Sequence, residues 1–212
     1  METIETRTTG NPLASLGRLG AVLQNRGFTL LLLLTSFSGI AGLAFIASST
    51  CIYQDGFHIS SQMYSFYFSL NAIGLISGPL LFLRLSRRFH PETIIKACYV
   101  ATAVAGGLEI LFGNRQPWIF ALCILPASIA GSCSRPPTAH LLLEQQKGDT
   151  GAVSSLMGAA GLLMGSLGLQ LVSLPWGNII LALGTLTLGA SGLALLLWPW
   201  VIQRTQRIPR TG

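Results

Sequence analysis

Residues 28–51 read FTLLLLLTSFSGIAGLAFIASSTC, a run that includes five consecutive leucines and contains no charged side chain. A helix needs about 20 apolar residues to cross the hydrocarbon core of a bilayer, so a stretch of this length is predicted to span a membrane. The run is too long for the apolar part of a cleaved signal peptide, and the leader before it is too long and too mixed in composition. We therefore interpret residues 28–51 as a transmembrane helix.

The rest of the chain repeats this pattern. Only 9% of the 212 residues are charged, against roughly a quarter in soluble domains, and the mean hydropathy is +0.60. A soluble globular protein, a disordered chain and a disulfide scaffold are thereby excluded. The runs do not alternate polar and apolar residues as barrel strands would, so we predict an all-α integral membrane protein with a six-helix transmembrane bundle. The predicted spans are residues 28–51, 63–83, 93–112, 118–143, 152–172 and 178–202.

Lysine and arginine residues are concentrated on alternate connections. They occupy the leader (residues 1–27), the second and fourth connections and the basic tail (residues 203–212), namely Arg7, Arg18, Arg26, Arg84, Arg87, Arg88, Lys96, Lys147, Arg204, Arg207 and Arg210. The connections on the opposite side contain one basic residue, Arg115. Because basic residues favour the cytoplasmic side, both termini are predicted to be cytoplasmic. Trp118 and Trp176 are then expected at the outer interface, and Trp198 and Trp200 at the inner one.

The leader contains an apolar stripe at helical spacing, formed by Leu13, Leu16, Leu19 and Leu23. This pattern favours a short helix lying on the cytoplasmic face of the membrane. Because Gly17 and Gly20 weaken a helix, a frayed linker is the alternative.

Polar side chains within a span are costly in lipid, so each is a candidate for a functional role. Asn71 lies near the middle of the second span, where it lines a cavity or bonds to a neighbouring helix. Glu109 and Lys96 lie near opposite ends of the third span and are expected to reach the membrane interfaces.

The fourth predicted span is interrupted by Arg135, Pro136 and Pro137. Arg135 lies about 26 Å along the helix from Trp118, near the cytoplasmic edge, which favours an anchoring role. The two prolines remove backbone donors and are predicted to kink the helix, either as a moving part or for packing alone.

Small residues four apart on a membrane helix allow neighbouring backbones to approach closely. The sequence offers two such pairs as helix-packing candidates, Gly74 with Gly78 and Gly161 with Gly165.

The chemistry of an enzyme or a metal site is not apparent. The histidines (His58, His90 and His140) fall in connections or at a helix end, and no acidic pair occurs within a span. The single cysteines (Cys51, Cys98, Cys123 and Cys133) form no metal-ligand pattern and are expected to be small buried hydrophobes. We therefore expect no enzyme activity, no metal and no cofactor. We also expect no nucleic-acid partner, because the basic residues form short clusters between apolar runs.

Several segments, taken in order, resemble a known family. Ser48 to Phe57 (SSTCIYQDGF) and Phe68 to Leu75 (FSLNAIGL) resemble the seventh and eighth helices of Bcr/CflA-type multidrug exporters, which belong to the major facilitator superfamily. Arg135 to Leu143 resembles the end of the tenth helix of that family, and Gly151 to Gly158 the start of its eleventh. Glu2-Thr3-Ile4 is similar to the opening of the central cytoplasmic loop.

The resemblance implies the carboxy-terminal half of a twelve-helix transporter, with Met1 inside the central loop and the first half, which carries the proton-coupling acid, absent. It implies a bacterial inner-membrane location and a cavity lined by the first, second, fourth and fifth spans, with the third and sixth as scaffold. On that basis the substrate-cavity candidates are Tyr53, Gln54, Tyr67, Asn71 and Pro126.

Two functional hypotheses follow. The first is efflux of a small amphiphilic drug, by proton antiport in the family, after pairing with a separate first-half polypeptide or a second copy. The alternative is a truncated non-transporting remnant or a six-helix membrane assembly subunit.

Overall fold

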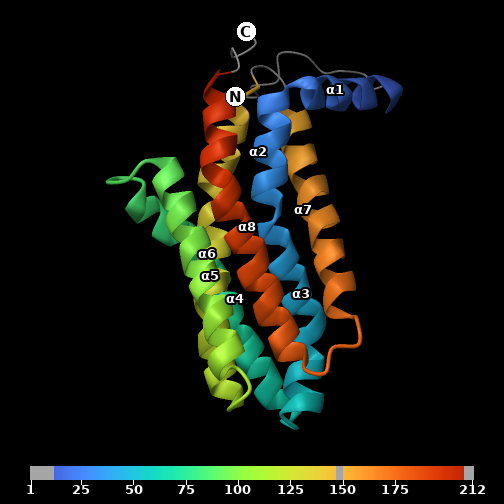
Figure 1. The fold of residues 1–212 in the computed structure, drawn as a ribbon, viewed down its shortest axis with the longest axis vertical. Coiled ribbons are helices and arrows are strands. Elements are labelled where there is room, and N and C mark those ends of the chain that lie inside the picture. Colours follow the sequence, from blue (N-terminus) through green and yellow to red (C-terminus); the bar gives the residue numbers. More distant parts are fainter. Residues whose placement is uncertain (1–11, 147–149, 208–212) are drawn as a thin grey trace, which may run out of the picture.

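The computed structural model describes residues 12–146 and 150–207, and every regular element in these ranges is helical (Figure 1). In chain order the elements are α1 (Pro12–Gln24), α2 (Arg26–Ser36), α3 (Ser38–Thr50), the π-helical turn η1 (Cys51–Gly56), α4 (Ser61–Leu85), α5 (Pro91–Phe112), α6 (Pro117–Glu144), α7 (Thr150–Val172) and α8 (Ile179–Arg207). Glu2-Thr3-Ile4, Arg7, Lys147 and Arg210 lie outside the described residues, as do the side chains of Leu13, Leu16 and Arg18.

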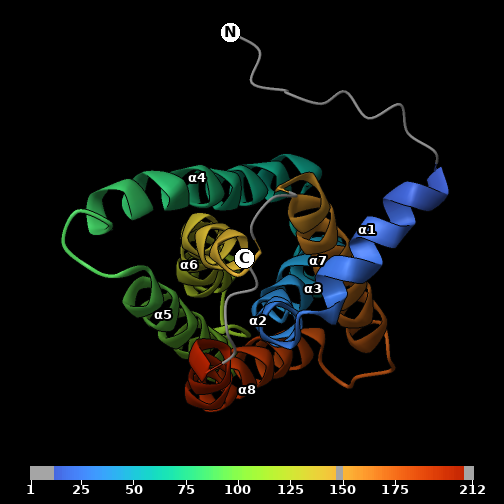
Figure 2. The ribbon, with the colours of Figure 1, turned by 90° about the horizontal axis from the view of Figure 1, so that it is seen from above.

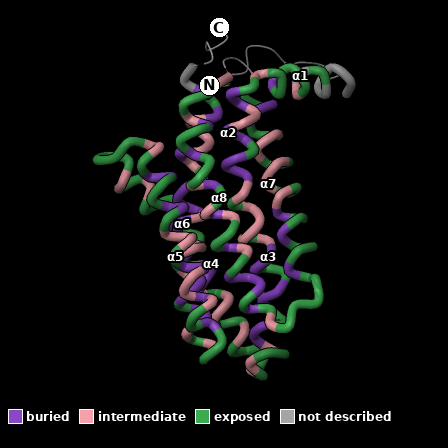
Figure 3. The backbone as a smooth tube through the Cα atoms, viewed as in Figure 1, coloured by how far each residue is buried: buried purple, intermediate pink, exposed green. Residues whose placement is uncertain are grey.

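Six helical runs in the described part are long and apolar enough to cross a membrane. They are Arg26–Gly56, Ser61–Leu85, Pro91–Phe112, Pro117–Glu144, Thr150–Val172 and Ile179–Thr205. The predicted all-α six-helix bundle is thereby confirmed. Exposed residues follow the helices along the outside of the bundle (Figure 3). They include large apolar side chains such as Ile76, Leu162 and Leu196, which are exposed by 69%, 66% and 77%. A surface of this kind suits lipid and indicates a multi-pass membrane protein.

The first run is not one uniform helix. The α-helical pattern is interrupted at Phe37, where the hydroxyls of Thr35, Ser36 and Ser38 donate to carbonyl oxygens one turn earlier over 2.6 to 3.0 Å. Such bonds tend to bend a helix because they compete with the backbone ladder. The run then continues past Cys51 as the π-helical turn η1.

Two asparagines fix connections at opposite ends of the bundle. Asn25 accepts hydrogen bonds from the first backbone N–H groups of α2, and its amide donates to the carbonyl oxygen of Gln145 at 2.9 Å. Asn178 caps α8 in the same way, and its amide donates to Asn114 Oδ1 at 2.9 Å. Each cap therefore also ties its helix to a distant connection.

Helix α1 lies across the end of the bundle where α8 ends (Figures 1 and 2). Val22 is buried in the core, and Leu19 packs against the same cluster. The leader segment Pro12–Gln24 is thus a helix in contact with the bundle.

Trp198 lies in the interior of the bundle, so the prediction that it marks the inner membrane interface is wrong. Trp198 is 1% exposed and its ring lies 6.2 Å from that of Tyr99 on α5. Trp200 is 45% exposed, with the Arg204 guanidinium 4.2 Å from its ring. Residues two apart on a helix point in nearly opposite directions, so only one of the pair faces outward.

Glycines form the tight seams between helices. A Cβ atom at Gly78 of α4 would lie 2.7 Å from both the Cys133 nitrogen and the Ile129 oxygen of α6. Gly74, one turn earlier, would meet the Leu125 side chain at 2.7 Å.

The two glycines predicted for packing on α7 behave differently. A Cβ at Gly165 would meet the Leu43 side chain of α3, whereas one at Gly161 would meet nothing within 4 Å. The close approach at Gly161 is made by its carbonyl oxygen, 2.6 Å from the position of a Cβ at Gly39. The small residue that matters there is therefore on the opposite helix.

Glu109 is fully buried, so the expectation that it reaches the outer interface is wrong. It is 0% exposed, and neither carboxyl oxygen has a hydrogen-bond partner among the described residues. A Cβ at Gly184 of α8 would lie 3.2 Å from the Glu109 Cβ, because Glu109 sits on the face of α5 that packs against α8. Lys96, near the other end of the helix, is exposed.

Candidate functional site

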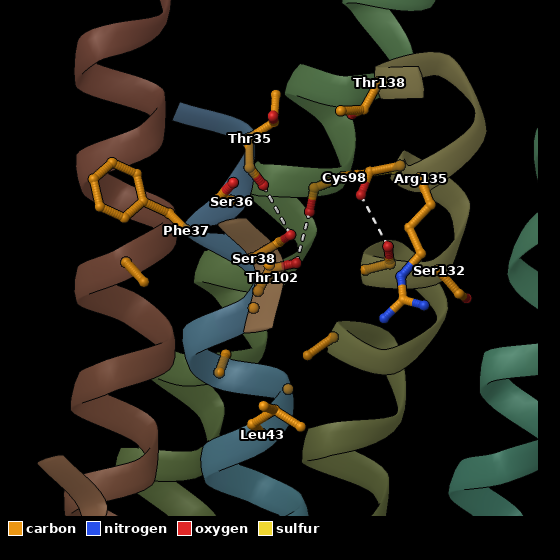
Figure 4. Close-up of a pocket in the computed structure, with 18 of the residues that line it drawn as sticks. Thr35, Ser36, Phe37, Ser38, Leu43, Cys98, Thr102, Ser132, Arg135 and Thr138 are labelled. Carbon is orange, nitrogen blue, oxygen red and sulfur yellow. Dashed lines mark hydrogen bonds between the residues drawn. The ribbon is translucent and has the colours of Figure 1, made fainter. Parts of the chain in front are cut away.

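A cavity of about 740 Å³ lies within the bundle. Its wall comes from the junction of α2 and α3 together with α4, α6 and α7, and also from parts of α5 and α8 (Figure 4). The volume falls in the range of sites that bind small molecules, about 300–1,000 Å³. Contrary to the implied scaffold role of the third and sixth spans, their helices contribute Cys98, Tyr99, Thr102, Thr187, Ala190 and Ser191 to the wall.

The polar part of the wall is mostly hydroxyl groups, and most of them donate a hydrogen bond within the protein. Thr35, Ser36, Thr102, Ser132 and Ser191 each donate to a backbone oxygen of their own helix. This satisfies the hydroxyl hydrogen inside the membrane without a partner helix, and leaves the oxygen available as an acceptor. Hydroxyl residues that recur inside apolar runs are the sequence signal for this lining.

Asn71 is the polar group that joins two helices across the cavity. Its Oδ1 accepts a hydrogen bond from the Ser128 hydroxyl of α6, and both residues line the wall. Asn71 is buried on the same face of α4 as Gly74 and Gly78, so the close seam between α4 and α6 brings the amide within reach of Ser128. Of the two roles open to Asn71, the structure shows both at once.

Arg135 also lines the cavity, on the same helix as Ser132 (Figure 4). Helix α6 continues through Pro136, which lines the wall, and Pro137, which is buried. The anchoring interpretation of Arg135 did not anticipate this position within the wall.

The other cavity candidates lie elsewhere. Tyr53 is 1% exposed within an aromatic cluster, where its ring stacks on Tyr67 at 5.4 Å and meets Phe120 edge-on at 5.3 Å. Gln54, on η1, is half-buried, and Pro126 is exposed on α6; none of these four candidates is among the described residues of the wall.

The aromatic cluster borders the cavity at Phe45. The Phe45 ring lies 6.5 Å from that of Phe120, and Phe45 belongs to the wall. The cluster sits around η1, at the end of the bundle away from α1 (Figure 1). Tyr53 and Tyr67 therefore help to close one end of the cavity rather than line it.

Comparison with known proteins gives a remote relationship. No family model matches the chain. Over 159 residues, or 73% of its length, the chain is 25% identical to YdgK of Bacillus subtilis (strain 168), described as an uncharacterized MFS-type transporter. The chain spans about two fifths (39%) of the length of that relative. The similarity supports a relationship to the major facilitator superfamily.

Proposed function

We propose that the chain is the carboxy-terminal half of a Bcr/CflA-like exporter in a bacterial inner membrane, with both termini cytoplasmic. The observation that carries the proposal is a cavity of about 740 Å³ whose apolar wall is interrupted by hydroxyls, one amide and one guanidinium. Such a wall suits a small amphiphilic compound, because it offers apolar area for the body of the molecule and a few polar groups for its orientation.

The two ends of the cavity differ in a way that fits alternating access. The aromatic cluster of Tyr53, Tyr67 and Phe120 lies at the end away from α1 and closes the cavity there. Release of a compound on that side requires the cluster to separate. The seam of α4 against α6, with small Gly74 and Gly78, allows these helices to move as one packed unit.

Proton antiport, which the family resemblance implies, needs an ionisable acid near the transported compound. Among the described residues, none of the acids lines the cavity. We propose that a separate first-half polypeptide supplies this acid, as the resemblance implies.

The test is drug efflux by cells that lack their own exporters, expressing the chain alone or with a matching first half. Export only in the paired cells would support a split transporter, and export by the chain alone would support a pair of identical copies. Stable membrane insertion without export in either case would refute transport and leave the remnant or assembly-subunit hypothesis.

The cavity itself is tested with a pair of glycines. A Cβ at Gly131 or at Gly107 meets no atom within 4 Å, but only Gly131 lines the cavity. Gly131→Leu is expected to fill the cavity and abolish export, whereas Gly107→Leu should retain it at equal abundance. Equal export by the two variants would contradict the cavity as the transport site.

A further inference from the structure

The charge of the cavity wall is one-sided. Arg135 is its sole charged side chain among the described residues, and no salt bridge involves it there. Glu144, further along α6, is already within 3.6 Å of His140. Arg135 is exposed and lines the cavity, and an ionisable group that lines a cavity inside a membrane protein commonly marks a ligand pathway.

Arg135 is also the strongest hydrogen-bond donor of the wall that has no partner among the described residues. Thr35, Ser36, Thr102 and Ser132 donate their hydroxyl hydrogens to backbone oxygens of their own helices. The Ser128 hydroxyl donates to Asn71 Oδ1. The guanidinium of Arg135 has five N–H donors, and no hydrogen bond from it to a described residue is present. The strongest unsatisfied groups facing the cavity are therefore donors, which match an anionic acceptor such as a carboxylate, sulfonate or phosphate.

The spacing along α6 sets the orientation of a ligand. Ser128, Ser132 and Arg135 stand at positions i, i+4 and i+7, so they share one face of the helix, and all three line the wall. Arg135 is about 10 Å from Ser128 along the axis. Beyond the polar stripe, the wall includes Leu43 and Leu162, which offer apolar area.

We propose that the cavity binds an amphiphile with an anionic head group, held by Arg135, with its apolar body lying toward Leu43 and Leu162. This inference rests on the proposed function and names the class of compound that the transport site takes. The anionic head group belongs either to a free solute or to an acidic phospholipid that enters the cavity.

The experiment uses the full chain in phosphatidylcholine nanodiscs, with empty nanodiscs subtracted. The anionic probe is 1-anilinonaphthalene-8-sulfonate, and the matched uncharged probe is N-phenyl-1-naphthylamine, which has the same rings without the sulfonate. The variants are Arg135→Gln and Arg135→Lys. Arg88→Gln is the control, because Arg88 is an exposed cation in the connection between α4 and α5, outside the wall.

Arg135→Gln is expected to weaken binding of the sulfonate about 10- to 100-fold, the effect of losing a hydrogen-bonded charge partner, and to leave the uncharged probe unaffected. Arg135→Lys keeps the charge but not the planar fork of the guanidinium, so its affinity for the sulfonate should lie between those of the wild type and Arg135→Gln. Arg88→Gln should bind both probes as the wild type does. If part of the nanodisc lipid is replaced by phosphatidylglycerol, loss of sulfonate binding identifies the head group as lipid, and retention identifies a free solute.

Several results would overturn the proposal: no saturable sulfonate binding by the wild type, unchanged sulfonate binding by Arg135→Gln, or equal weakening of both probes. Equal loss in Arg88→Gln would do the same by showing a general surface-charge effect. Loss of sulfonate binding on addition of a first-half polypeptide would show that Arg135 pairs with a protein acid instead. Binding that depends on Arg135, in a chain that exports nothing either alone or with a first half, would refute the transport proposal and retain the binding site.

Discussion

Gly78→Ala tests how closely α4 is held against α6. The added Cβ would fall on the Ser132 side chain and lie 2.7 Å from the Cys133 nitrogen and the Ile129 oxygen. These two backbone atoms are the donor and acceptor positions of one helical turn of α6, so they cannot rotate away as a flexible side chain would. The Ser132 hydroxyl is itself held, since it donates to Ser128 and Ile129 at 3.0 and 3.1 Å.

The magnitude follows from this geometry. To restore an ordinary contact of 3.4 Å or more from 2.7 Å, α4 must move outward by at least about 0.7 Å at this point, and further where the Ser132 hydroxyl keeps its place. One methylene too many in a packed seam costs about 1–3 kcal/mol. Because α4 has α6 as its main packing partner, no other helix compensates for the shift. The same movement stretches the contact between Asn71 and Ser128, so export should fall together with stability.

The assay is equilibrium unfolding in mixed micelles, followed by tryptophan fluorescence. Gly107→Ala is the control, because it gains the same helix propensity but its Cβ meets nothing within 4 Å. Gly78→Ala should be less stable than the wild type by about 1–3 kcal/mol, whereas Gly107→Ala should be unchanged or more stable by up to about 1 kcal/mol. A Gly78→Ala protein as stable as Gly107→Ala would refute the close seam.

Three further predictions concern single groups. Glu109→Met should stabilise the chain by about 1–3 kcal/mol in the same unfolding assay, because it removes a buried carboxyl without a hydrogen-bond partner; destabilisation would show that the carboxyl has a partner in the membrane. Asn71→Ala and Ser128→Ala should each cost about 1 kcal/mol, and the double variant no more than either single one; additive losses would show that the two side chains do not interact. In a variant whose native cysteines are serine, a membrane-impermeant maleimide should label Gln116→Cys in intact cells and Arg88→Cys only after lysis, since the positive-inside rule places their connections on opposite sides; the reverse pattern would invert the proposed orientation.

The six spans follow from the sequence alone because hydropathy over about 20 residues is a local property, set by the thickness of the bilayer. The stretch from 28 to 51 lies within Arg26–Gly56, and the interrupted fourth span lies within one continuous helix, Pro117–Glu144. The presence of Asn71 inside a span, and hence its interest, is local in the same way. The position of a residue along the axis of its membrane-spanning helix can therefore be predicted from the sequence.

The face on which a residue lies was decided by the tertiary structure. Tyr53 was expected in the cavity and is in an aromatic cluster, while Glu109 and Trp198 were expected at interfaces and are buried against neighbouring helices. Arg135 lines a cavity whose wall exists only because α2, α3, α6 and α7 come together. In water an amphipathic stripe would reveal the buried face, but in lipid both faces of a helix are apolar, so the sequence carries little signal for rotation about the axis. Close packing through small residues fixes that rotation, and with it the chemistry that faces the cavity.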